Sequence, residues 1–191
     1  MPREEISLVA PERVLETRRL LLEPLTGAHA AGLYGQLLDG RLYAFIPQDP
    51  PASERELEDR YRRLSGRRSP DGGEAWLNWA AREKDAGGYV GILEATVFGD
   101  GTAAIAYTVF VPHQRRGFAA EGCKRVLGHL FEDYGVSPVV AEIDTRNDAS
   151  VALVEALGFR RASFRKVADH FKGASSDEYR YELRGPEHPR C

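Results

Sequence analysis

The chain has 191 residues, of which 42% are hydrophobic and 29% charged, and its formal net charge is −3. These values are typical of one ordinary globular domain and exclude disordered, collagen-like and fibrous classes. The slight negative charge gives no global basic field for nucleic acid or an anionic membrane, and we see no membrane-spanning stretch or signal peptide. We expect one cytoplasmic domain over residues 1–191, with a core at about 17–184 and terminal extensions at 1–16 and 185–191.

The hydrophobic pattern changes its period several times along the chain. The first part of the chain predicts a strand at 19–25, a helix from an N-cap at Thr26 to Leu38 and a helix from Ser53 to about Leu64. Three strands follow at 75–83, 88–98 and 103–111, and then a long helix that ends at Gly135. The last part predicts a strand at 139–144, a helix at 148–157 and strands at 159–168 and 178–184 around a polar loop, 172–177. The order is therefore β-α-α-β-β-β-α-β-α-β-β.

The connections between these elements indicate the topology of the sheet. Short turns at 85–88 and 99–101 join three strands into an antiparallel meander. The strand at 139–144 follows the long helix, and parallel neighbours require such a crossover. We therefore expect an α+β fold whose mixed, mostly antiparallel central sheet of about seven strands is flanked by helices, and not a doubly wound fold.

The stretch 109–122, VFVPHQRRGFAAEG, places a turn directly before the long helix. A helix N-terminus carries unpaired backbone N–H groups and partial positive charge, so this junction is a candidate anion site. Gly117 permits a positive φ and close approach of a phosphate. Residues 112–125 carry a local charge of +3 on a chain of net −3, which suits a polyanionic small molecule.

Two other interpretations of this stretch are open. Gly117 is also what an ordinary turn requires, and the two arginines before the helix are also compatible with a solvated surface. The spacing Gly117-x-Ala119-x-x-Gly122 imitates a dinucleotide-binding fingerprint, so a nucleotide-binding domain of another fold is an alternative. Three antiparallel strands before the motif and a single crossover after it argue against that alternative.

A second polar segment, 144–150 (DTRNDAS), follows the crossover strand. Asn147, Asp148 and Ser150 are good helix caps, and a capping role alone would explain them. The segment also lies where the carboxyl end of a parallel neighbour meets the anion loop. Ligands of open sheets bind at such ends, so the two segments together predict one site.

Taken together, Q-R-R-G-F-A at the strand-to-helix turn, N-D-A-S after the crossover strand and A-L-G-F at 156–159 resemble the GNAT superfamily of N-acetyltransferases. The opening T-R-R-L-L-L at 17–22 and the A-x-E at 119–121 are similar to its ribosomal-protein N-terminal acetyltransferase branch, which is RimJ/RimL-like. The likeness covers about residues 17–184.

The resemblance implies acetyl-CoA as co-substrate and direct transfer of an acetyl or other short acyl group to a primary amine. Backbone N–H groups of the turn would bind the pyrophosphate, the strand end would pair with the pantetheine amides, and Asn147 would hydrogen-bond the cofactor arm. The implied cofactor-binding residues are Phe110, Val111, Gln114, Arg115, Arg116, Gly117, Phe118, Ala119 and Asn147.

The resemblance also implies a catalytic residue, because Ser150 lies where family members place a hydroxyl near the sulfur. The resemblance does not supply the base, and Glu94, on the strand before that of Ala104, is the candidate, acting through a water. Two positions depart from the family pattern. Ala104 stands where this branch carries a carboxylate, and Val154 stands where the superfamily often has a tyrosine. Cys123 lies in an apolar helical stripe, so we expect it to be a small buried hydrophobic residue.

The identity of the acceptor stays open. A protein N-terminal α-amine and small-molecule amines are both compatible with the sequence, and we expect the loops 43–51 and 170–177 to select between them. The departures at Ala104 and Val154 make a binding-only acyl-CoA sensor the alternative function. The five histidines show no metal-ligand spacing, so we expect no metal, and a homodimer is compatible with the sequence.

Overall fold

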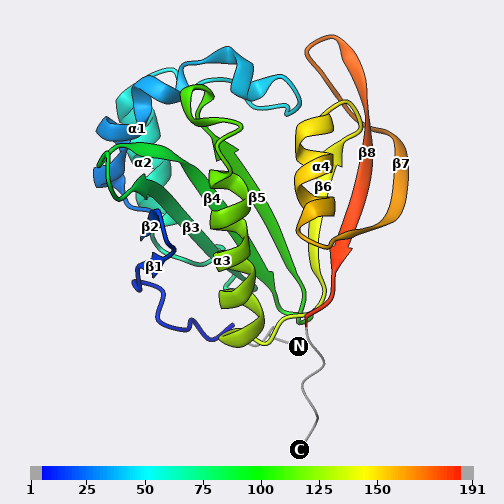
Figure 1. Ribbon diagram of the computed structural model, residues 1–191, viewed down its shortest axis with the longest axis horizontal. Coiled ribbons are helices and arrows are strands. Elements are labelled where there is room, and N and C mark those ends of the chain that lie inside the picture. The colour runs from blue at the N-terminus through cyan, green and yellow to red at the C-terminus, as the bar shows by residue number, and fades with distance from the viewer. Residues whose placement is uncertain (1–5, 186–191) are drawn as a thin grey trace, which may run out of the picture.

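The computed structural model describes residues 6–185 and contains one eight-stranded sheet with helices on both faces (Figure 1). The strands are β1 (Leu15–Glu16), β2 (Leu20–Pro24), β3 (Glu74–Glu83), β4 (Tyr89–Phe98), β5 (Ala103–Val109), β6 (Val139–Asp144), β7 (Arg160–Phe171) and β8 (Ala174–Leu183). The helices are α1 (Ala30–Leu37), α2 (Glu54–Leu64), α3 (Phe118–Glu132) and α4 (Asp148–Ala156), and the 3₁₀ turns are η1 (Gly27–His29), η2 (Gly40–Tyr43) and η3 (Val111–His113).

The strands are ordered β1-β2-β3-β4-β5-β6-β8-β7 across the sheet. Among the named strands of the described chain, β5 and β6 alone pair in parallel, because α3 carries the chain back between them. The predicted mixed, mostly antiparallel α+β fold is confirmed. The strand beyond the expected seven is β1, a two-residue strand on β2 within the segment expected as an N-terminal extension.

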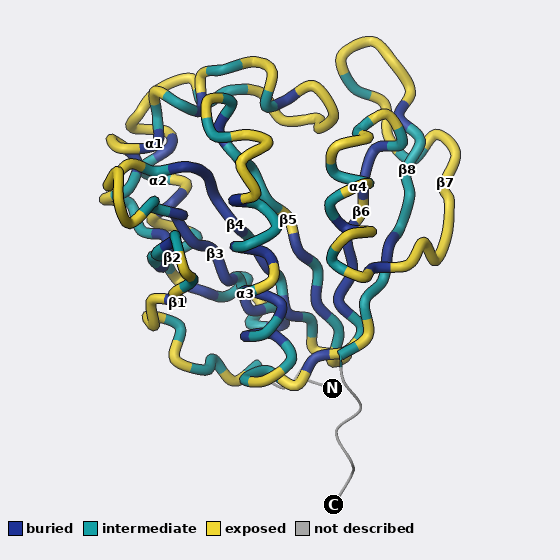
Figure 2. Tube along the Cα trace, in the orientation of Figure 1, coloured by how far each residue is buried: buried dark blue, intermediate teal, exposed yellow. Residues whose placement is uncertain are grey.

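The sheet buries a hydrophobic core on each face. Leu93 and Ala95 of β4 pack with Phe118 and Cys123 of α3 in the larger core, whereas Ile92 of β4 belongs to the core under α1 and α2. Adjacent strand residues point to opposite faces, so one strand supplies both cores. Figure 2 shows the central strands as the most continuously buried part of the chain.

Of the two helix starts predicted before β3, the structure confirms one and moves the other. Ser53 Oγ accepts a hydrogen bond from the Glu56 amide at 3.1 Å, so the predicted cap of α2 is confirmed. Thr26 instead caps the 3₁₀ turn η1, where its amide donates to Nδ1 of His29 at 3.0 Å, and α1 begins only at Ala30. The expected helix at Thr26–Leu38 is therefore a short 3₁₀ turn followed by a shorter α-helix.

The C-terminal strands are longer than the sequence indicated. The expected polar loop at 172–177 is wrong, because β7 and β8 run to a tight turn at Lys172 and Gly173. Their φ angles of 52° and 76° place both residues in the left-handed region that such a turn requires. Residues 186–191 of the expected C-terminal extension and 1–5 of the N-terminal one lie outside the described residues.

Across residues 6–185, none of the helices has both the length and the apolar character needed to cross a membrane.

Candidate functional site

The parallel strands β5 and β6 separate soon after they pair. Their register contains two pairs, Ala103 with Val139 and Ala104 with Val140, whereas β5 stays paired with β4 as far as Val109. Within the described chain, residues 105–109 therefore have no strand partner on the β6 side, and Figure 1 shows the two strands opening apart. A strand edge of this kind leaves backbone N–H and C=O groups available to a ligand.

A cavity of about 420 Å³ lies along this opening. Its walls come from β5, the turn before α3, the start of α4 and the segment after α1. Seven of the predicted site residues line it together, namely Gln114, Arg115, Gly117, Phe118, Ala119, Asn147 and Ser150. The structure thus brings the anion loop and the segment after the crossover strand to one cavity.

The other predicted residues at the strand end do not line the cavity. β5 ends at Val109, two residues earlier than expected, and Val111 opens the turn η3. Phe110 is fully buried in the core under α1 and α2, and its carbonyl accepts a hydrogen bond from the His113 amide at 2.8 Å. In place of Phe110 and Val111, the open edge of β5 presents residues 107–109 to the cavity.

The N-terminus of α3 faces the cavity without a side-chain cap. Gly117, the N-cap residue, has φ 80° and ψ 6°, and Arg115 two residues earlier has φ 60°. A backbone that turns in this way directs successive N–H groups toward one side, where an anion can accept them. The positive local charge and the positive end of the helix dipole both attract an anion to this side.

A hydrogen-bonded clamp holds this turn in place. Glu121 of α3 accepts from the Arg19 amide at 2.7 Å, from Arg19 Nε at 2.6 Å and from Thr17 Oγ1 at 2.6 Å. Burial acts to raise the pKa of Glu121, but these donors together lower it, so the carboxylate stays charged. Arg19 Nη1 also donates to the carbonyl of Arg116 at 3.0 Å, which links β2 to the turn.

Arg116 points away from the cavity wall. Its guanidinium donates to Glu83 at 3.1 Å and lies 4.8 Å from the ring centre of Phe118. The guanidinium of Arg19 lies 4.6 Å from the same ring centre. The ring of Phe118 is therefore in contact with two cations, which fixes the first residue of α3. Arg116 supports the turn from outside, and Arg115 is the arginine that lines the cavity.

The start of α4 forms the opposite wall. Asn147 caps this helix, since its Oδ1 accepts from the Ser150 amide at 3.1 Å, and both residues line the cavity. Tyr107 of β5 reaches across, and its hydroxyl donates to the Ser150 carbonyl at 3.4 Å. Burial raises the pKa of Tyr107 to about 12, so the hydroxyl keeps its proton.

Asp144, at the end of β6, holds the segment before α4. Its side chain accepts from the Arg146 amide at 2.9 Å, from Arg146 Nε at 2.8 Å and from Ser176 Oγ at 2.6 Å. The hydrogen bonds from Arg146, followed by that from Ser176, lower the pKa of Asp144 to about 2 against the opposing effect of burial. Its own carbonyl accepts from the Asn147 amide at 2.9 Å, so it positions the cap of α4.

Glu94, the candidate base, does not line the cavity. It shares a face of β4 with Ile92, toward α1 and α2, and burial raises its pKa while the charge of Arg60 opposes that rise. The alternation of the sequence did not decide which face of the sheet this side chain takes. In the structure it lies on the face opposite to Leu93 and the core under α3.

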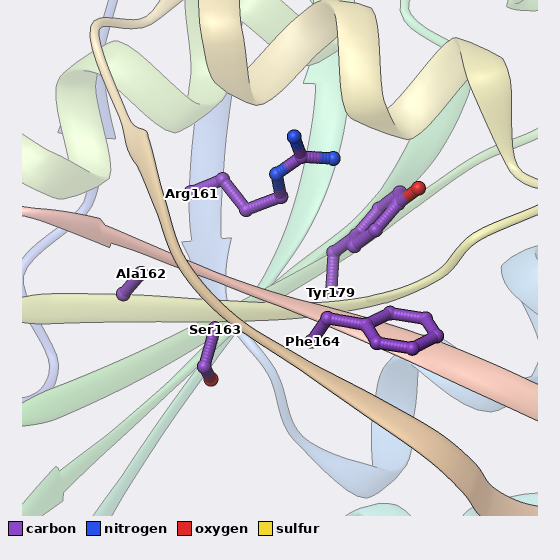
Figure 3. Close-up of a pocket in the computed structure, with 5 residues that line it drawn as sticks. All are labelled: Arg161, Ala162, Ser163, Phe164 and Tyr179. Carbon is purple, nitrogen blue, oxygen red and sulfur yellow. The ribbon is translucent and has the colours of Figure 1, made fainter.

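A second hollow, of about 460 Å³, lies on the C-terminal hairpin away from this site. Figure 3 shows Arg161 and Tyr179 directed to one side of the hairpin with Phe164 beside them, and Ser163 directed away. None of its lining residues belongs to the cavity beside α3.

Two further predictions concern metals and the cysteine. Over the described residues, 6–185, no cluster of three or more His, Cys, Asp or Glu side chains is arranged to hold a metal ion. Cys123 is buried, and burial raises its thiol pKa to about 12, which makes it a poor nucleophile.

The elements that build the cavity belong to a known domain family. Residues 19–160 match the model of the acetyltransferase (GNAT) domain, and the chain therefore belongs to the GNAT family. The predicted resemblance to that superfamily is confirmed. The match covers the β2–β6 sheet, the turn before α3 and α4, which are the elements that build the cavity.

One protein of similar sequence and two of similar structure serve as examples. The chain is 22% identical to the uncharacterized N-acetyltransferase YoaA of Bacillus subtilis over 91% of this chain and 97% of that protein. The ribosomal-protein-S5-alanine acetyltransferase of Vibrio fischeri has a similar structure, with a TM-score of 0.78 at 16% identity over 90% of this chain and 96% of that one. The spermidine N-acetyltransferase of Vibrio cholerae, solved with CoA and spermine, has a TM-score of 0.73 at 18% identity over 87% and 95%.

Asp144 gives a prediction for stability. Its pKa is lowered from 3.8 to about 2, a difference worth about 2 kcal/mol at neutral pH. A lowered carboxyl pKa stabilises the fold above pH 3.8, and this contribution is lost as the pH falls through about 2. Asp144→Asn should therefore lose about 2 kcal/mol in urea unfolding at pH 7, with the difference from wild type shrinking toward pH 2.

The control for this prediction is Asp85→Asn, which changes an exposed carboxyl in the turn before β4. It should alter stability by no more than about 0.5 kcal/mol at either pH. A pH-independent difference between Asp144→Asn and wild type would contradict the assignment.

Proposed function

We propose that the protein transfers an acetyl group from acetyl-CoA to a primary amine, and that the acceptor is the α-amine of a protein N-terminus, as in the RimJ/RimL-like branch. The observation that carries the proposal is the cavity that joins the uncapped start of α3 to the open edge of β5. A diphosphate fits the first feature, and an amide-containing arm fits the second.

Several residues of this chain fit the cofactor. The N–H groups from Arg115 to Ala119 would bind the pyrophosphate, and the backbone of residues 107–109 would hydrogen-bond the pantetheine amides. Gln114 Nε2 donates to the Val109 carbonyl at 3.0 Å and so braces the end of β5. The Oδ1 of Asn147 is used in capping α4, which leaves its amide N–H groups for the cofactor arm.

When bound, acetyl-CoA would supply the acetyl group as a thioester open to attack by a neutral amine. The Ser150 hydroxyl would donate a hydrogen bond to the departing sulfur. Glu94 would take the proton of the amine, and a water must relay it because the Glu94 side chain does not line the cavity. Because burial raises the pKa of Glu94, its basicity lies closer to neutral pH than that of an ordinary carboxylate.

The charges of the cavity bear on the acceptor. Its lining includes Arg115 and Arg41, whose guanidinium is paired with Asp39 at 2.6 Å, and among the described residues no aspartate or glutamate. A polyamine would bring several ammonium groups to a wall whose own side chains offer no carboxylate. The apolar side chains Leu42 and Phe45 in the lining suit the first side chains of a peptide better.

The protonation of the acceptor points the same way. An α-amine titrates near ~8 and a lysine side chain near ~10.4, so roughly a tenth of the former and well under a hundredth of the latter is neutral at pH 7. The only proposed base acts through a water. An acceptor that is more often already deprotonated, the α-amine, is therefore favoured over a lysine side chain.

A binding-only acyl-CoA sensor is the second candidate. It is supported by the absence of a carboxylate from the described cavity lining and by the non-polar side chains of Ala104 and Val154. Such a protein would keep the cofactor features and release no thiol.

The activity is tested by following CoA thiol release from acetyl-CoA with a panel of amines. We expect turnover with peptides that carry a free α-amine and none with spermidine or with the same peptides N-terminally blocked. Cofactor binding without turnover on any amine would favour the sensor, and turnover on spermidine alone would overturn the proposed acceptor.

The cofactor site is tested by Gly117→Glu, which places a side chain and a negative charge at the start of α3. At ~100 Kd of CoA the wild type should gain about 2.7 kcal/mol, or roughly 5–11 °C in Tm, and NAD should give no shift. The variant should lose the CoA shift.

Gly87→Glu is the matched control, because Gly87 has a similar φ of 70° in a turn with open space around it. It carries the same backbone strain and charge and should keep the shift with CoA. Retention of the shift in Gly117→Glu would mean that Gly117 serves only the turn.

The base is tested by Glu94→Gln, which keeps the shape of the side chain and removes its basicity. We expect kcat to fall about 100-fold with CoA affinity unchanged. The acid limb of the wild-type kcat profile should lie above the ordinary range of a glutamate, because burial raises this pKa. A change in kcat below about twofold would exclude Glu94 as the base.

A further inference from the structure

The ammonium of Lys172, at the tip of the β7–β8 hairpin, reaches a segment more than a hundred residues earlier in the chain. Its Nζ donates to the carbonyl oxygens of Tyr43 at 2.5 Å, Ile46 at 2.9 Å and Gln48 at 2.9 Å. It also lies 5.9 Å from the ring centre of Tyr43. Within the described chain these contacts tie residues 43–48 to the C-terminal hairpin.

This set of acceptors matches the donor. A lysine ammonium has three N–H groups and no acceptor, and here three carbonyls converge on it. Hydrogen bonds from a charged donor are the stronger kind, and the turn at Lys172 and Gly173 fixes the position of the stem through two positive φ angles. An ion pair with Asp49 at 3.9 Å adds charge attraction to these three directional hydrogen bonds.

The segment that Lys172 holds is otherwise anchored mainly at its start, where Arg41 pairs with Asp39 and Tyr43 is buried. We call residues 40–51 the acceptor loop. The Tyr43 hydroxyl donates to the Leu37 carbonyl at 2.9 Å and fixes one end of the loop. Phe45 and Ile46 are each 36% exposed, so burial of their side chains does not hold the loop strongly. Figure 1 shows the chain after α1 crossing the top of the sheet toward the hairpin of β7 and β8.

The acceptor loop is also a wall of the cavity. Arg41, Leu42 and Phe45 line the cavity from this loop. The carbonyls that Lys172 binds flank Phe45 on both sides in sequence. The position of this aromatic side chain in the cavity lining therefore depends on a contact made by the C-terminal hairpin.

We infer that Lys172 is a positioning residue that ties the acceptor loop to the β7–β8 hairpin and thereby sets the affinity for the acceptor amine. The inference rests on the proposed acetyltransferase function and adds the element that shapes its acceptor side. Lys172 does not line the cavity, and its effect should reach the acceptor and not the cofactor.

The test compares Lys172→Met with Lys166→Met, which removes an exposed lysine from β7 of the same hairpin. Hydrogen exchange of the amides of residues 42–46 and 48 is measured first, without any ligand. It should become about 10-fold faster in Lys172→Met and stay unchanged in Lys166→Met, as expected when roughly the free energy of one charge-assisted hydrogen bond is lost.

Kinetics with acetyl-CoA and an N-terminally free peptide follow. Lys172→Met should raise the KM for the peptide about 10-fold and leave the KM for acetyl-CoA within about twofold of wild type. Unchanged hydrogen exchange, faster exchange with an unchanged peptide KM, or equal changes in the two KM values would each overturn the inference. Absence of turnover by the wild type would count against the proposed function alone, because exchange tests the tie by itself.

Discussion

The short parallel contact between β5 and β6 is the constraint on which the rest of the site depends. The two strands share two residue pairs, while β5 has seven with β4 and β6 has six with β8. Each strand is therefore held on its outer side and free on its inner side. Backbone groups that a continuous sheet would have satisfied internally are left for a ligand. The cavity is a consequence of topology more than of any single side chain.

The turn before α3 places positive charge on one side of that opening. Arginines at a helix N-terminus oppose the helix dipole, which by itself is slightly unfavourable. The structure accounts for one of them, because Arg116 pairs with Glu83 and packs on Phe118 outside the cavity. Arg115 is left at the wall with the uncapped helix start. Positive potential is thereby concentrated on the side where β5 is open.

Features with a local cause could be predicted from the sequence. The change from period 2 to period 3.6 located the meander and α3, and the glycine-containing turn indicated the uncapped helix start that lines the cavity. Features that depend on contacts between distant parts of the chain could not be predicted in this way. Phe110 and Val111 were expected at the strand edge, but the turn η3 ends β5 at Val109. The direction of Glu94 depends on which face α1 and α2 cover, and alternation alone does not give the face.

The clamp around Glu121 has a consequence for how this chain can vary. Its carboxylate accepts from the Arg19 side chain, but also from the Arg19 backbone amide and from the Thr17 hydroxyl. Exchanging the two residues, with arginine at 121 and glutamate at 19, would keep the opposite charges and still leave those two donors facing a cation. A substitution at 19 would lose the side-chain contacts with Arg116 and Phe118 but keep the hydrogen bond from the backbone amide to Glu121. A substitution at 121 that removes the acceptor would leave the Arg19 amide and the Thr17 hydroxyl without their partner. The side chain at 121 is therefore the more constrained of the two.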